Sequence, residues 1–88
     1  MSQADRIAKR MTKGWTSTLQ MMRPDDGPPI TSPHRRMTEW REAHCWMELD
    51  GHYPVETCLF NGKYYREETR KVKRGTVWCI DRRLVLVK

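Results

Sequence analysis

The stretch "ITSPHRRMTEWREA", residues 30–43, reads as one amphipathic helix with its start signal attached. Thr31 or Ser32 can cap the helix, and Pro33 suits the first helical position because its missing N–H has no helical partner there. At 100° per residue, one stripe of the helix and its continuation collects Met37, Trp40, His44 and Met47. The stretch therefore predicts a helix that packs one face against a core.

The opposite face of this helix is polar and mixed in charge. It carries Arg35, Thr38, Glu39 and Glu42, with Arg36 and Arg41 on the flanks. Arg35 and Glu39 are four residues apart, a spacing that favours an ion pair on a solvated helix surface. This face is expected to be exposed, either as an ordinary solvated surface or as a surface that contacts a partner.

The N-terminal residues 2–13 predict another helix. Ser2 can cap it, Asp5 lies in its first turn, and Gly14 suits the left-handed position that ends a helix. Its apolar residues recur at helical spacing: Ile7, Ala8 and Met11.

A short second helix is expected over "TLQMMR", residues 18–23, capped by Thr16 or Ser17 after an extended piece at Trp15. The side chains expected to face inward are those of Leu19 and Met22. The prolines and glycine of "PDDGPPI", residues 24–30, end this helix and predict a loop.

The pattern then changes from helical to extended. "HYPVETCLF", residues 52–60, predicts a strand, and "NG" at 61–62 is a tight-turn signal. "KYYREETRKVKRG", residues 63–75, reads as a long, polar, basic turn, and the sequence leaves open whether it forms an ordered wing or a mobile loop. "TVWCI" at 76–80 and "LVLVK" at 84–88 predict two further strands separated by "DRR".

These elements predict one α+β domain over residues 1–88. Three helices in a helical part, residues 1–50, are expected to pack on a C-terminal antiparallel sheet, residues 51–88. The expected core consists of Ile7, Met11, Leu19, Met37, Trp40, Val55, Leu59, Val77 and Ile80. Because a core this small is thin, Trp15, Trp46, Trp78 and Phe60 are also expected to contribute to burial.

The net charge of +6 is unevenly distributed. Residues 1–23 carry +4, residues 24–50 carry −3 and residues 51–88 carry +5. A basic domain with its charge at both ends favours a polyanionic partner, although a solubilising surface gives the same composition.

The order of elements resembles the winged helix-turn-helix domain, especially its small versions in phages and mobile elements. The resemblance rests on "ADRIAKRMTKGWTSTLQMM" at 4–22, "ITSPHRRMTEWREA" at 30–43 and "GHYPVETCLF" at 51–60. It implies a third helix in the DNA major groove and a C-terminal β-hairpin whose tip touches the backbone or the minor groove.

Two segments depart from that pattern. "HCWMELD", residues 44–50, adds about a turn after the third helix, and "TVWCIDRRLVLV", residues 76–87, could form a separate sheet. A second likeness is to phage excisionases, themselves winged-helix proteins, because "VET" at 55–57 and "VKRG" at 72–75 are similar to their pattern.

The resemblance assigns DNA-contact roles to particular residues. The expected base readers are His34, Arg35 and Thr38, at the end of the helix that meets base edges in this motif. The helix N-terminus, with the hydroxyls of Thr31 and Ser32, can hold a phosphate. The expected wing contacts to phosphate are Lys63, Arg66, Arg70, Lys71, Lys73 and Arg74. Glu39 and Glu42 weigh against this interpretation because carboxylates repel phosphate.

The predicted function is double-stranded DNA binding by a small transcriptional regulator or a recombination accessory factor. One alternative is an excisionase-like factor that bends DNA. Another is a phage-derived inhibitor or adaptor that binds a recombinase or a host protein through exposed tryptophans, for which Trp40, Trp46 and Trp78 are candidates. The sequence leaves a homodimer open.

Other chemistry is not expected. His44, Cys45, His52 and Cys58 lack the paired spacing of zinc ligands, so neither a metal nor another cofactor is predicted. Nothing orients a cysteine and a histidine for nucleophilic catalysis, so no enzyme activity is predicted. An odd number of cysteines favours buried free thiols, and the chain lacks the apolar run of a membrane span or signal peptide, which favours the cytoplasm.

Overall fold

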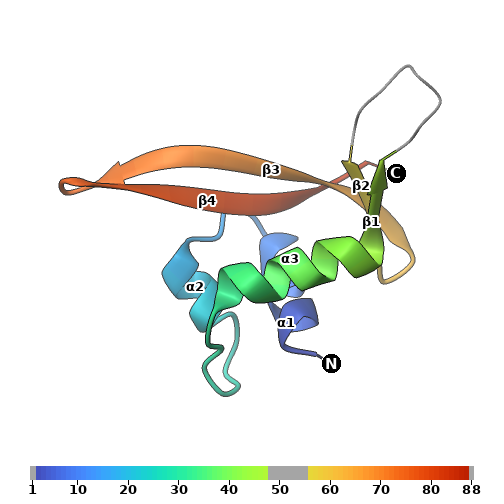
Figure 1. Cartoon of the computed structure of the whole chain (residues 1–88), viewed down its shortest axis with the longest axis horizontal. Coiled ribbons are helices and arrows are strands. Elements are labelled where there is room, and N and C mark those ends of the chain that lie inside the picture. The colour runs from blue at the N-terminus through green and yellow to red at the C-terminus, as the bar shows by residue number, and fades with distance from the viewer. Residues whose placement is uncertain (1, 48–55, 88) are drawn as a thin grey trace.

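The computed structural model describes residues 2–47 and 56–87, with the backbone alone for Cys45–Met47 and Glu56. The helices are α1 (Gln3–Met11), α2 (Thr18–Met22) and α3 (Pro33–His44). The strands are β1 (Cys45–Met47), β2 (Glu56–Phe60), β3 (Lys63–Arg74) and β4 (Val77–Leu86). The prediction of an α+β fold with three helices and an antiparallel sheet is confirmed (Figure 1).

The first two helices begin where the sequence predicts. Ser2 caps α1 by accepting a hydrogen bond from the Asp5 N–H at 3.0 Å. Ser17 caps α2 in a capping box, in which its hydroxyl accepts from the Gln20 N–H and the Gln20 side chain accepts from the Ser17 N–H. Gly14, between the two helices, has a φ of 139° that disfavours a side chain.

The inward face of α2 differs from the prediction. Met21 is fully buried, Met22 is half-buried and Leu19 is 76% exposed. Met21 and Leu19 are two residues apart, about 200° around a helix, so burying one exposes the other. The prediction for Leu19 was wrong because a five-residue helix is too short for its pattern to define a face.

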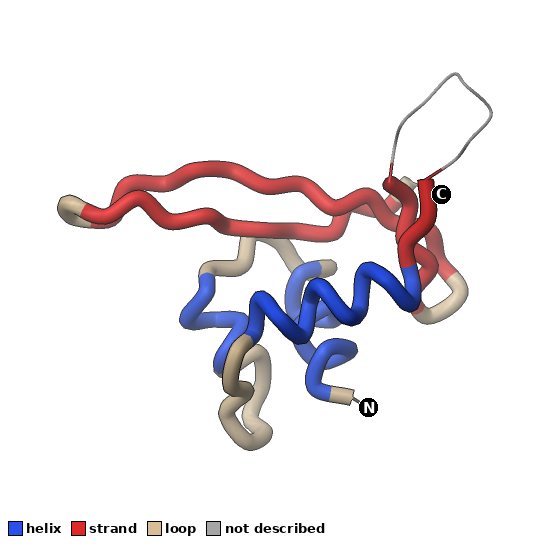
Figure 2. Tube along the Cα trace, viewed as in Figure 1, coloured by secondary structure: helices blue, strands red, loops and turns tan. Residues whose placement is uncertain are grey.

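The loop that follows α2 (Figure 2) is tied to α1 by an ion pair between Asp25 and Arg6. The Arg6 guanidinium donates hydrogen bonds to the Asp25 carboxylate and, at 2.8 Å, to the Pro28 carbonyl. Asp25 also accepts from the Gly27 N–H at 2.9 Å. The hydrogen bond from Arg6, followed by that from Gly27, lowers the pKa of Asp25 from 3.8 to about 2. At the end of the loop, Ile30 is fully buried.

The third helix begins at Pro33 as predicted but ends earlier. Ser32 has a left-handed φ of 52° rather than the extended geometry of an ordinary N-cap, while its carbonyl accepts from the Arg36 N–H. The helix stops at His44, and residues 45–47 form β1. Met47 therefore does not continue the helical stripe, and the predicted boundary between helical and β parts at residue 50 was too late.

The four strands form one antiparallel sheet in the order β1-β2-β3-β4. Asn61 and Gly62, with φ of 51° and 74°, make the predicted tight turn between β2 and β3. Residues 63–74, predicted as a turn, are a strand that pairs with β4 from Tyr65↔Leu86 to Arg74↔Val77. The prediction failed because cross-strand ion pairs, rather than apolar alternation, hold this polar segment extended.

The C-terminal strand is continuous through "DRR" instead of being broken there. Gly75, with a φ of 64°, closes the β3–β4 hairpin, which lies across the helices and extends beyond α2 (Figure 1). Thr16 pairs with Arg82 in an isolated antiparallel bridge, so the predicted extended piece at Trp15 joins the edge of β4.

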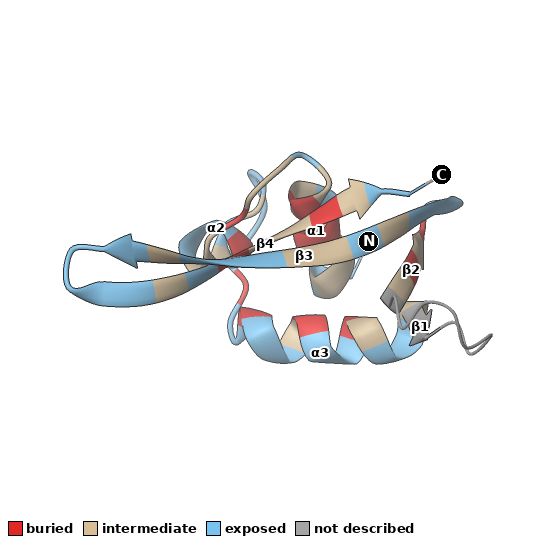
Figure 3. Ribbon diagram, turned by 90° about the horizontal axis from the view of Figure 1, so that it is seen from above, coloured by how far each residue is buried: buried red, intermediate tan, exposed pale blue. Residues whose placement is uncertain are grey.

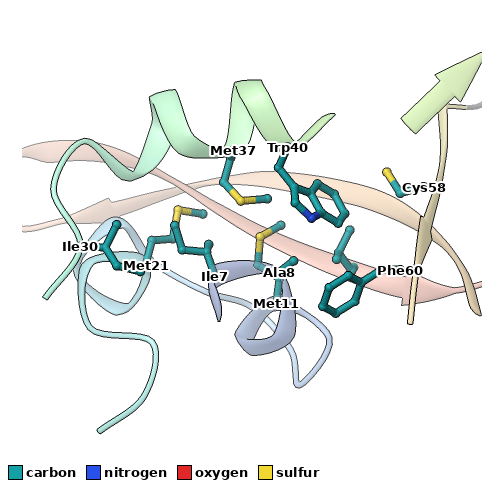
Figure 4. Packing of buried hydrophobic residues seen from close by; sticks show 10 residues of the cluster. Ile7, Ala8, Met11, Met21, Ile30, Met37, Trp40, Cys58 and Phe60 are labelled. Atoms are coloured by element: carbon teal, nitrogen blue, oxygen red, sulfur yellow. The ribbon is translucent and has the colours of Figure 1, made fainter. Parts of the chain in front are cut away.

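The core lies between the helices and the base of this hairpin (Figure 4). Ile7, Met11, Met37 and Trp40 are buried as predicted. Other buried members of the cluster are Ala8, Met21, Ile30, Cys58, Phe60 and Leu84. The predicted core residues Val77 and Ile80 are exposed, because they lie where the hairpin extends past the helices, and Leu59 is half-buried. Val55 lies outside the described residues.

The tryptophans differ in burial. Trp78 is 65% exposed and Trp15 is half-buried, so Trp40 is the tryptophan that fills the described core.

The cysteines also differ from one another. Cys58 is buried and disulfide-bonded, whereas Cys79 is a free thiol. The expectation that the cysteines are all free thiols was wrong.

A buried carboxylate joins α3 to the hairpin. Glu67 on β3, whose side chain is 8% exposed, accepts two hydrogen bonds from Arg41 on α3 at 2.6 and 2.7 Å and one from Arg82 on β4 at 2.8 Å. Desolvation opposes ionisation of Glu67, but the two arginines outweigh it and hold its pKa below the ordinary value.

Replacing Glu67 with Gln should lower the free energy of unfolding by about 3 kcal/mol, because two guanidinium groups lose their buried counter-charge. Urea denaturation at pH 7 measures this loss. Glu68→Gln is the matched control, because Glu68 is the adjacent carboxylate, also pairs with two arginines, and is more exposed. Equal losses of unfolding free energy for the two variants would show that Glu67 contributes no more to stability than the more exposed Glu68.

Stability should also fall in acid. Since folding depresses the pKa of Asp25, its contribution is present above pH 3.8 and disappears as the pH falls toward about 2. Thermal melts between pH 6 and pH 2 should show Asp25→Asn to be less acid-sensitive than the wild type. An unchanged pH dependence would show that the Arg6–Asp25 pair does not contribute.

Candidate nucleic-acid interface

Two surfaces carry the predicted DNA contacts: the outer face of α3 and the β3–β4 hairpin. Arg35, Thr38, Glu39 and Glu42 are all exposed, and Arg36 and Arg41 are half-buried on the flanks, as the helical spacing predicts. Seen from above, the outward side of α3 and the distal half of the hairpin are both exposed (Figure 3).

The three predicted base readers have partners within the protein. The His34 Nε2 lies 3.1 Å from the Thr18 hydroxyl on α2. The Thr38 hydroxyl donates to the His34 carbonyl at 3.0 Å. Arg35 Nε lies 3.5 Å from a Glu39 oxygen, and Arg36 lies 3.7 Å from the other oxygen.

These contacts differ in strength. The Arg35 side chain is 79% exposed, and an exposed ion pair of this kind contributes little and breaks readily when a phosphate or base is available. His34 is more constrained, because partial desolvation and then the charges of Arg82 and Arg41 lower its pKa below 6.5. A neutral His34 can offer a hydrogen bond to DNA but no charge.

The N-terminus of α3 is also a weak candidate for phosphate binding. Thr31 and Ser32 are exposed, and the left-handed backbone of Ser32 departs from the cap geometry that the phosphate prediction assumed. Glu39 and Glu42 lie on the same outer face as Arg35. The outer face of α3 therefore combines one exposed arginine with two carboxylates.

The hairpin register sorts its side chains onto two faces, because antiparallel partners point the same way and neighbours alternate. One face, here the Trp15 face, includes Arg66, Glu68, Arg70, Arg74, Asp81 and Arg83. The other, here the Leu84 face, includes Glu67, Lys71, Lys73, Trp78, Ile80, Arg82 and Leu84. The six predicted wing contacts are therefore not one surface.

On the Trp15 face, arginines pair with carboxylates. Arg70 and Arg74 lie 3.3 and 2.9 Å from Asp81, whose side chain is 2% exposed. Hydrogen bonding from Arg74 outweighs desolvation and lowers the pKa of Asp81. Arg70 and Arg83 also lie over the Trp15 ring at 4.5 and 4.3 Å from its centroid.

The same face continues toward the base of the hairpin with a second set of pairs. Arg66 and Arg83 both bind Glu68, at 3.0 and 2.6 Å. The arginines of the Trp15 face are therefore largely committed to structural roles.

The lysines of the hairpin, unlike its arginines, are not held by carboxylates of the described residues. Among the residues that the structure describes, Lys63, Lys71 and Lys73 take part in no ion pair. Lys71 and Lys73 are exposed on the Leu84 face of the distal hairpin, opposite Ile80 and Trp78. Lys63 lies beside the β2–β3 turn, at the other end of β3.

The sequence predicted Ile80 in the core and left Trp78 open as either a core residue or an exposed interface residue, whereas the structure exposes both. Both belong to an apolar run, which favoured the core, but alternation within "VWCID" already places them together on one face of a strand. Where that face is exposed follows from the length of the hairpin, which the sequence patterns did not reveal.

The chain was compared with protein-family models, curated proteins and solved structures, and none of them matches it. No helix in residues 2–47 and 56–87 is long and apolar enough to cross a membrane. Within the same residues, no group of three or more histidine, cysteine or acidic side chains is arranged to hold a metal ion.

The lowered pKa of His34 is directly testable. In an NMR titration its imidazole should protonate below pH 6.5 and be neutral at pH 7. Thr18→Val, which removes the hydroxyl partner while keeping the side-chain shape, serves to test whether that contact holds the ring. A midpoint above 6.5 would contradict the assigned environment and restore His34 as a cationic phosphate contact.

Proposed function

We propose that the protein binds double-stranded DNA and that the β3–β4 hairpin is the principal contact, with the N-terminal half of α3 as a secondary one. The roles that fit are those of a small transcriptional regulator or a recombination accessory factor.

The observation that supports this proposal is the charge balance of the hairpin. Residues 63–87 contain eight lysines and arginines against three carboxylates. Each carboxylate is bound by arginines, so the excess positive charge lies on exposed side chains, including all three lysines. An excess of exposed cations on a projecting element favours phosphate binding.

The shape of the hairpin also suits a duplex. A strand of twelve residues is about 40 Å long, close to the roughly 34 Å of one turn of B-DNA. A two-stranded ribbon fits the major groove, which is about 12 Å wide. By contrast, the carboxylates on the outer face of α3 make that helix a weaker candidate for groove entry.

A winged-helix arrangement is part of the proposal. The Thr16–Arg82 bridge supports it, because a short extended piece after the first helix pairs there with the last strand. The short strands β1 and β2, inserted between α3 and the long hairpin, depart from the simple pattern.

Lys73→Ala should weaken binding to all duplex sequences alike and reduce the slope of log affinity against log salt by about one. Fluorescence anisotropy with mixed-sequence duplexes at several salt concentrations measures both. Lys9→Ala on α1, which removes the same charge from the helical side, should change the slope less.

Arg35→Ala distinguishes DNA contact through α3 from DNA contact through the hairpin. If α3 reads bases, this change should cost about 1–3 kcal/mol on a cognate site and relax specificity there. If the hairpin dominates, mixed-sequence affinity should change little. An absence of salt-dependent duplex binding by the wild type would overturn the proposed function.

A protein-binding inhibitor or adaptor is the second candidate. Leu19, Val77 and Trp78 are 76%, 61% and 65% exposed, and exposed apolar side chains of this size are typical of protein interfaces. The protein-binding function is favoured if the wild type does not bind duplex DNA.

A further inference from the structure

Four side chains gather on the Leu84 face of the distal hairpin, in a surface here called the distal patch: Lys71, Lys73, Trp78 and Ile80. They form two adjacent cross-strand pairs, Lys73↔Trp78 and Lys71↔Ile80, each with one cation and one apolar side chain. Trp78 is 65% and Ile80 is 42% exposed, so the patch is open to solvent.

The hairpin carboxylates lie elsewhere. Asp81 and Glu68 are on the Trp15 face, and Glu67 shares the Leu84 face but is bound near the base by Arg41 and Arg82. The distal patch therefore has two cations without a compensating acid from the hairpin.

The tryptophan ring is accessible as well as exposed. The Lys73 ammonium lies over the ring at 6.0 Å from its centroid, the outer limit of a cation–π contact, and Trp78 is still 65% exposed. On the Leu84 face of β4, Leu84 is 4% exposed, whereas Ile80 and Trp78, which lie nearer the hairpin turn, are 42% and 65% exposed. Burial of this face against the helices therefore ends before the distal patch.

We infer that the distal patch takes a nucleobase from duplex DNA: Trp78 stacks on a base displaced from its neighbours, while Lys71 and Lys73 contact the flanking phosphates. The inference rests on the proposed function and specifies how the hairpin carries it out. A nucleotide combines a flat aromatic face with an adjacent negative charge, and the patch presents the complements of both on neighbouring side chains.

The location of the patch favours a duplex as the source of the base. It lies near the end of a projecting ribbon, so Trp78 can enter a groove while the helices stay outside (Figure 1). An apolar side chain that enters a groove and separates a base step also bends the duplex. The excisionase-like alternative would use such a bend.

Displacing a base costs least where the base is already unpaired. A duplex with one unpaired extra base should therefore bind the wild type more tightly than a fully paired duplex of the same sequence. Anisotropy titrations with fluorescein-labelled duplexes of the two kinds give this preference as a ratio of Kd values.

Trp78→Ala should reduce affinity for the bulged duplex by about five- to 150-fold and bring the ratio toward one. Trp78→Phe, which keeps an aromatic face, should retain most of the preference. Val77→Ala is the matched control, because Val77 is similarly exposed beside the same turn but points to the Trp15 face. Circular dichroism and thermal melting confirm that each variant folds.

Tryptophan fluorescence provides a readout that does not depend on affinity. Stacking on a base should quench the emission of the wild type at saturating bulged duplex more than that of Trp78→Phe. Equal quenching would overturn the inference.

The remaining outcomes separate the two proposals. If the wild type binds paired duplex but Trp78→Ala keeps the preference, or loses affinity equally for both duplexes, the stacking inference fails and the proposed function stands. If the wild type binds the bulged duplex alone, the stacking inference stands and general duplex binding fails. If the wild type binds neither duplex, both proposals fail and the protein-binding function is favoured.

Discussion

The carboxylate of Glu67 is the contact on which the arrangement of the two halves depends. It lies under the hairpin and binds one arginine from α3 and one from β4. A helix and both strands of the hairpin therefore meet at one buried charge, which tolerates little displacement because an unpaired ion at that depth is costly. The apolar core supplies burial, whereas this contact sets where α3 lies relative to the sheet.

The other ion pairs of the hairpin decide which of its cations are available to a partner. Asp81 and Glu68 bind the arginines of the Trp15 face, and the Trp15 ring packs against two of them. Lysines are left on the exposed surface. A count of charges over residues 63–75 treats these side chains as equivalent, but the alternation of a strand places them on opposite faces with different roles.

The outer face of α3 and the distal patch offer different kinds of contact. The first has Arg35 beside two carboxylates, with His34 held by Thr18, which suits hydrogen bonding at a few positions. The second has two lysines around an exposed aromatic ring, which suits phosphate and base faces without regard to sequence. In the proposed function the hairpin supplies affinity, and α3, where it reaches the duplex, adds selectivity.

Sequence alone determined those features that depend on a residue and its near neighbours. Ser2 and Ser17 as caps, Pro33 as a helix start, the Asn61–Gly62 turn, and the buried stripe of Met37 and Trp40 all follow from local hydrogen bonding and helical spacing. Only the tertiary structure decided that residues 63–74 are a strand, that α3 ends at His44, and that Trp78 and Ile80 are exposed. Ion pairs such as Arg41–Glu67 join residues far apart in sequence, and the reach of the hairpin beyond the helices depends on where the core ends. Neither is encoded in the period of any one segment.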